Sequence, residues 1–79
     1  MARYTILIYP EEGVYSVLVP ALDNLATQGD TVEEAVAMAR DAIEFYIRGL
    51  IEDGEDVPEE DVPPYVVSVD VPVPVAATA

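Results

Sequence analysis

The spacing of apolar residues changes once along this chain, and that change limits the folds open to it. Up to Gly29 the apolar residues come in short runs rich in β-branched and aromatic types, which is typical of strands. From Thr31 onward they recur every three or four residues, which predicts a helix with one apolar face. Strands followed by one helix predict an α+β fold.

The expected order of elements is β-β-β-α-β, an antiparallel sheet with one helix packed on one face. Proline and glycine within residues 10–13 predict a turn that joins the first two strands in a hairpin. The predicted strands are residues 3–9, 14–19, 25–29 and 65–71. Residues 1–71 would form a single domain, and residues 72–79 a C-terminal tail that contains proline.

Helix-capping residues mark both ends of the predicted helix. Thr31 and Glu34 fit a capping box, with Thr31 as N-cap and Glu34 reaching back to the Thr31 backbone N–H. Gly54 is a natural stop, because helices often end on a glycine with left-handed backbone geometry. Gly49 lies inside the span and weakens it by up to about 1 kcal/mol relative to alanine, so the helix could end there instead.

The absence of cysteine and histidine excludes several kinds of stabilisation and chemistry. Among 79 residues there is neither type, which rules out disulfides, a structural zinc site and catalysis by cysteine or histidine. A domain of this size buries a small core. Oligomerisation is the usual remaining source of stability.

The charge balance indicates which partners the chain can bind. Sixteen acidic residues stand against three arginines, for a net charge of -13. Binding to nucleic acid or to an anionic membrane needs a basic patch, so we expect neither. A basic protein partner is favoured, although such acidity also serves solubility alone. No run resembles a membrane span or a signal peptide, and we expect a cytoplasmic protein.

Apolar residues point to both faces of the predicted sheet. One helix is about 10 Å across, too narrow to cover a sheet of four strands on even one face. We therefore expect a homodimer or higher oligomer that buries the second face or pairs an edge strand. The alternative is that these residues are isolated exposed side chains, and that those on the helix only widen its core face. The candidate interface residues are Leu7, Tyr9, Val14, Leu18, Met38 and Phe45.

No arrangement of residues predicts catalysis. The acidic segment 52–61 lacks the ligand spacing of a calcium loop, and the chain has no glycine-rich phosphate loop. Serine and threonine have no histidine or lysine to activate them. We expect no enzyme, no metal and no cofactor. A hydrolase that uses Asp53 or Glu55 with Mg²⁺ is a remaining alternative.

Several short motifs, in order, resemble the N-terminal domain of the HicB antitoxin family. The resemblance runs from Tyr4 to about Pro58, and its most specific part is Thr-Gln-Gly-Asp-Thr at 27–31 followed by Glu-Glu-Ala at 33–35. The other matching pieces are Gly13-Val14-Tyr15, Val19-Pro20-Ala21-Leu22 and Gly49-Leu50-Ile51-Glu52-Asp53-Gly54-Glu55.

The resemblance implies a fold and a partner. The fold would be a degraded RNase H core, and the partner would be HicA, a small basic RNA-cleaving toxin whose active site the antitoxin masks. Many members add a C-terminal DNA-binding domain, whereas this chain ends soon after its last predicted strand, so we expect a stand-alone member. A stand-alone oligomeric domain with no toxin partner is the alternative function. An RNase H site also needs a carboxylate on the first strand to hold metal, and residues 3–9 contain none.

Overall fold

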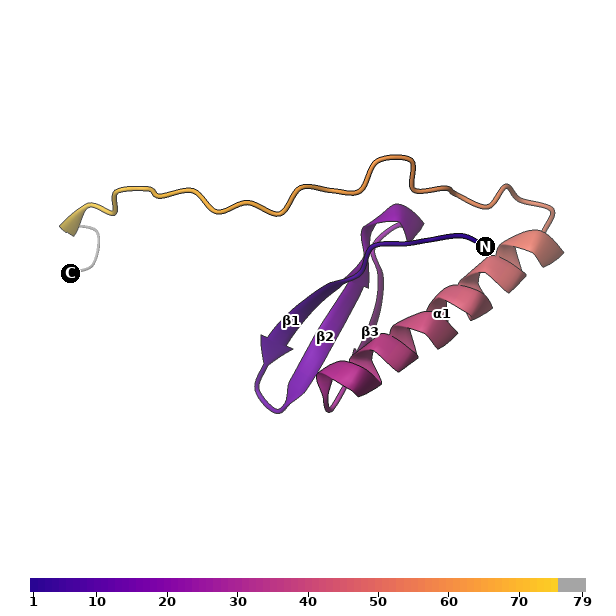
Figure 1. The fold of residues 1–79 in the computed structure, drawn as a ribbon, viewed down its shortest axis with the longest axis horizontal. Helices are drawn as coiled ribbons and strands as arrows, with labels where there is room; N and C mark the ends of the chain where they lie inside the picture. Colours follow the sequence, from indigo (N-terminus) through magenta and orange to yellow (C-terminus); the bar gives the residue numbers. More distant parts are fainter. Residues whose placement is uncertain (76–79) are drawn as a thin grey trace.

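The computed structural model describes residues 1–75 and contains one three-stranded antiparallel sheet with one long helix against it (Figure 1). The strands lie in the order β1-β2-β3. This arrangement confirms the predicted α+β fold of three antiparallel strands followed by a helix. The elements are β1 (Leu7–Glu11), β2 (Val14–Val19), the short 3-10 helix η1 (Pro20–Leu22), β3 (Leu25–Gly29) and α1 (Val32–Glu52).

The hairpin between β1 and β2 is tighter than the sequence predicts. Glu11 pairs with Val14, which leaves only Glu12 and Gly13 in the turn. Gly13 has φ of 75°, a left-handed conformation that glycine adopts without a steric penalty. Strand β1 therefore runs later than the expected residues 3–9. Pro10 is accommodated inside it because β1 is an edge strand, where the missing N–H removes no pairing to a further strand.

The connection from β2 to β3 is built from two left-handed residues. After the turn of η1, Asp23 and Asn24 have φ values of 58° and 56°. Asparagine and aspartate tolerate this region better than most residues, because their short polar side chains bond locally. The connection brings β3 back antiparallel to β2, with Val19 opposite Leu25.

Local hydrogen bonds define both ends of α1. Thr31 is the N-cap, and the Glu34 N–H donates to its Oγ1 at 3.0 Å. The Glu34 carboxylate accepts from the Asp30 N–H at 2.9 Å, one residue before the expected partner. At the other end Gly54 has φ of 73°, and the N–H of Glu55 donates to the Leu50 carbonyl at 2.9 Å. The helix thus continues through Gly49 and stops where the second glycine allows it.

The core lies between the sheet and the first half of α1. Val17, Ala35 and Ala39 are buried together, and Ile6, Ile8 and Tyr15 pack around them. Small residues on this stripe of the helix let its backbone come close to the sheet. At Gly29 a Cβ would lie 2.5 Å from the Ala35 backbone nitrogen, so only glycine fits there.

The helix covers only part of the sheet face on which it lies. It packs mainly on β3 and less on β2, and it has little contact with β1. Its second half extends past the end of the sheet (Figure 1). Because one helix spans about two strands, the helix-facing side of β1 stays open.

The predicted fourth strand is wrong for this structure. Residues 65–71 take no part in the sheet and are exposed. The chain instead leaves the end of α1, passes the end of the sheet beside the N-terminal chain and runs outward as an extended segment (Figure 1). The radius of gyration is 16.6 Å, against about 12 Å for a compact domain of this length. Of the expected tail, residues 76–79 lie outside the described residues.

Candidate interaction surface

The sheet face away from α1 carries the strand residues that the sequence marks as candidate interface. Cross-strand pairing aligns Leu7 with Leu18, and Leu18 with Ala26, in one row across all three strands. Tyr9 follows Leu7 on the same face because alternate residues of a strand share a side, and its side chain is 48% exposed. No other element among the described residues covers this row, so the open face presents an apolar strip to solvent.

The hairpin end of the open face is polar. Tyr9 lies opposite Ser16, which in turn lies opposite Gln28. The Ser16 hydroxyl donates a hydrogen bond to the Glu11 carboxylate. Val14 pairs with Glu11 at this end and so is separated from the apolar row. The structure therefore brings together three of the four candidate interface residues that lie on strands and leaves Val14 apart.

The two helix candidates lie on the flank of α1 beside β3. Seven residues separate Met38 and Phe45, which places them almost directly above one another on a helix. Met38 and Leu18 line the same open hollow of about 570 Å³, whose wall also includes Ala26 and Gln28. Phe45 does not line it and is 76% exposed. Met38 therefore extends the open face around β3, and Phe45 projects from the part of α1 beyond it.

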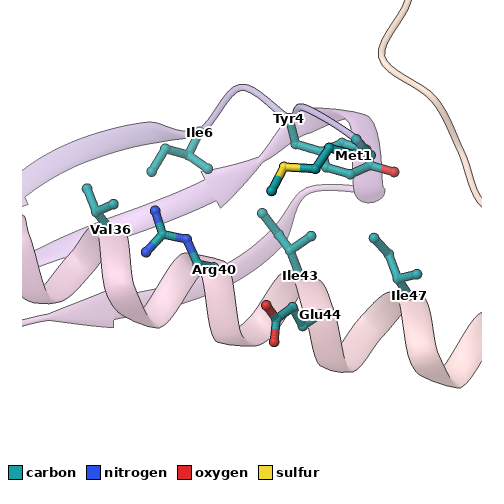
Figure 2. A pocket seen from close by; sticks show the side chains of 9 residues that line it. Met1, Tyr4, Ile6, Val36, Arg40, Ile43, Glu44 and Ile47 are labelled. Carbon is teal, nitrogen blue, oxygen red and sulfur yellow. The ribbon is translucent and has the colours of Figure 1, made fainter.

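A second apolar surface, which the sequence analysis did not identify, lies on the opposite flank of α1. It is a groove of about 470 Å³ between the chain leading into β1 and the helix. In Figure 2 its side chains face one another from these two elements. The lining residues are Met1, Ala2, Tyr4, Ile6, Val36, Arg40, Ile43, Glu44 and Ile47.

The groove follows from the size of the helix residues. The stripe that touches the sheet consists of Ala35 and Ala39, whereas the larger Val36, Ile43 and Ile47 face the chain that leads into β1. Those larger residues recur at intervals of seven and four, so they share one flank of the helix. This pattern is present in the sequence, where it is indistinguishable from ordinary core residues until the position of the helix over β2 and β3 is known.

The segment after α1 is tied to the start of β1. The Thr5 N–H donates to Glu60 Oε1 at 2.8 Å, and the Tyr4 hydroxyl donates to the Pro58 carbonyl at 2.6 Å. The Thr5 hydroxyl donates to the second carboxylate oxygen of Glu60. Glu60 therefore has a definite structural role, which distinguishes it from the other acids in the segment 52–61.

Most acidic side chains form an exposed, strongly negative surface. Seven of the sixteen lie between Glu52 and Asp61, and all but Glu60 in that segment are exposed. Within the described residues no group of acids is arranged to hold a metal ion. In the same part of the chain, no helix is long and apolar enough to cross a membrane. A dense negative surface of this kind attracts positive charge at a distance.

Comparisons with known proteins link this chain to small bacterial and archaeal proteins. It is 43% identical over 60 residues to the UPF0150 protein ssr1765 of Synechocystis, covering 75% of this chain and 76% of that protein. It is 40% identical over 60 residues to the UPF0150 protein Ta0767 of Thermoplasma acidophilum, covering 75% and 87%.

A third relative is an antitoxin by name. Antitoxin HicB 1 of Photorhabdus laumondii is 44% identical over 57 residues, which cover 71% of this chain and 37% of that protein. No solved structure matches the chain significantly, so the expected relation to an RNase H core stays a prediction. The model of the HicB-like antitoxin of bacterial toxin-antitoxin systems matches residues 4–70. This chain belongs to the HicB-like antitoxin family.

Proposed function

We propose that this protein is a non-catalytic antitoxin that binds a small basic RNA-cleaving toxin and covers its active site. Family membership over residues 4–70 is the observation that carries the proposal. The net charge of -13 supports it, because complementary charge speeds encounter with a basic partner and disfavours direct contact with nucleic acid. Such a partner would be met in the cytoplasm.

The open sheet face supplies the contact surface in this proposal. Specific interfaces pair an apolar centre with a polar rim. The row Leu7, Leu18 and Ala26 would be that centre, with Met38 at its edge. The acidic surface would act mainly on the association rate, and the apolar row on the lifetime of the complex.

The test is a binding and cleavage assay with a purified HicA-family toxin, preferably the one encoded beside this gene. The wild-type chain should bind the toxin, stop RNA cleavage and restore growth of cells that express it. Leu18→Arg should abolish protection, whereas Val62→Arg, at an exposed apolar residue outside the open face, should retain it. Failure of the wild-type chain to bind any such toxin contradicts the proposal.

Salt separates the charge contribution from the apolar one. The association rate should fall steeply as salt is raised, because exposed charges are screened beyond about 10 Å at 0.1 M. Val62→Arg should slow association slightly through its added positive charge, and Leu18→Arg should in addition shorten the lifetime of any remaining complex. An association rate that is independent of salt would contradict the electrostatic part of the proposal.

A second candidate is a self-associating module without a toxin. The observation in its favour is the uncovered apolar row, together with the match to most of the length of two UPF0150 proteins but only 37% of the named antitoxin. Light scattering on the purified chain and a toxin titration distinguish the two: self-association without toxin binding supports the second candidate alone.

A further inference from the structure

The segment after the acidic loop has the residue pattern of a strand with one apolar face. Tyr65, Val67, Val69 and Val71 occupy alternate positions, and Ser68 and Asp70 lie between the last three. Alternation of this kind is typical of a strand packed on one side. The match to the family model extends through residue 70, so nearly all of this segment lies within the matched part of the chain.

The exposed surface of the chain is larger than a single folded copy should have. Its accessible surface is 6477 Å², against about 4,650 Å² for a compact monomer of this mass. The surplus of about 1,800 Å² exceeds the roughly 800 Å² that each partner buries in a standard protein interface. The valines at 66, 67, 69 and 71 contribute directly, since each is between 68% and 79% exposed.

The receiving site for such a strand is the free edge of β1. Strand β1 has β2 on one side only, so its other edge offers unpaired backbone groups for strand addition. The groove lined by Ile6, Ile43 and Ile47 lies beside the chain that leads into β1. A strand added at this edge would place its apolar row beside Ile6 and Ile8 and close the outer side of the groove.

The chain's own segment is directed away from this edge. Glu60 and Pro58 are held against Thr5 and Tyr4, and Pro63-Pro64 follows almost at once. Proline holds φ near -65° and restricts the residue before it to extended conformations, which favours a straight linker over a tight return. In Figure 1 the segment accordingly runs outward past the sheet.

We propose that residues 65–71 add as a strand to the β1 edge of a second copy, with the exchange made in both directions in a symmetric dimer. The high net charge does not oppose this pairing locally, because Asp70 is the one charged residue in the segment and residues 4–9 carry none. The proposal deepens the self-association named above and requires no toxin, so its failure leaves the toxin assay unaffected.

Crosslinking between copies tests the exchange, and the chain has no native cysteine to interfere. Tyr9→Cys and Ser68→Cys, whose side chains would lie on the same face of the extended sheet, are made separately, mixed, treated with a short bismaleimide and analysed by mass spectrometry. The expected product is a covalent pair with one copy of each variant. Because the exchange is reciprocal and closed, the double variant should give pairs joined by two crosslinks and no larger products. Crosslinking within single chains of the double variant, or no product from the mixture, would overturn the proposal.

A proline substitution supplies an independent readout. Val69→Pro removes a backbone donor from the middle of the added strand, and the mass from light scattering should fall from twice the chain mass to the single 8.5 kDa chain. Val73→Pro, between Pro72 and Pro74 and outside the strand, is the matched control and should leave the dimer intact. A wild-type chain that is monomeric at high concentration, or a Val69→Pro variant that stays dimeric, would overturn the proposal.

Discussion

Valines at alternate positions are buried in one region of this molecule and exposed in another. Val17 and Val19 in β2 are 0% exposed, whereas Val67 and Val69 beyond the acidic loop are both 79% exposed. The intrinsic preference for a strand is the same in both places. Strand β2 has β1 and β3 on its two sides and α1 above it, and the later segment has no such neighbours. The comparison teaches that alternation specifies which face is apolar, while burial requires a surface to receive that face.

The largest expected effect is a cavity in the buried region. Val17→Ala should lower the free energy of unfolding by about 2–3 kcal/mol, because removal of buried methyl groups loses their transfer energy and leaves a cavity. Urea unfolding followed by circular dichroism measures it. A loss below about 0.5 kcal/mol would mean that the core is not packed as the structure indicates, and the contrast with the exposed valines would disappear.

The close approach of α1 to β3 gives the next effect. Gly29→Ala should destabilise the fold by about 1–3 kcal/mol, because the added methyl group meets the Ala35 backbone rather than a flexible side chain. Gly49→Ala is the control, and its effect on stability should have the opposite sign. Nothing lies within 4 Å of a Cβ there, so alanine should stabilise the helix by about 0.5–1 kcal/mol. Equal effects at the two glycines, measured by thermal unfolding, would contradict the packing described here.

The N-terminal cap of α1 contributes a smaller amount. Thr31→Ala should cost about 1 kcal/mol, because the Glu34 N–H loses its side-chain acceptor. Thr31→Ser keeps that oxygen and should remain close to wild type. Differential scanning calorimetry on the three proteins resolves this order, and a serine variant as unstable as the alanine variant would assign the effect to packing instead of capping.

The smallest effect is expected in the exposed region under dilute conditions. Val69→Ala should change the stability of the single chain by less than about 0.5 kcal/mol, as exposed substitutions usually do. At high protein concentration the loss should grow, because the proposed dimer then contributes to stability. Unfolding curves at two protein concentrations measure this. The same loss at both concentrations would indicate that Val69 is buried within its own chain.

The sequence predicts well those features that depend on local chemistry. The hairpin, the Thr31 cap and the stop at Gly54 each follow from a residue type whose backbone or side-chain preference acts within a few positions. The open sheet face was also predicted, because a single narrow helix cannot cover both sides of a sheet.

Features that depend on distant packing were predicted less well. Strand β1 lies four residues later than expected at its start, where Tyr4 and Thr5 bond to the chain near residue 60. The groove beside β1 depends on where α1 crosses the sheet, which the periodicity of the helix does not specify. Residues 65–71 have the residue pattern of a strand, but a strand needs a sheet edge with which to pair. The sequence alone does not say whether that edge belongs to the same copy of the chain or to a second copy.

Hydrogen exchange at the backbone amides of residues 65–71 tests the central claim most directly, because it reports whether this segment is paired. The account predicts protection that appears at high protein concentration and is lost on dilution, as the strands leave the partner's sheet. The amides of β2 should stay protected throughout and serve as the internal reference. Rapid exchange of residues 65–71 at every concentration would contradict strand pairing, and protection that persists on dilution would show that the segment pairs with its own sheet.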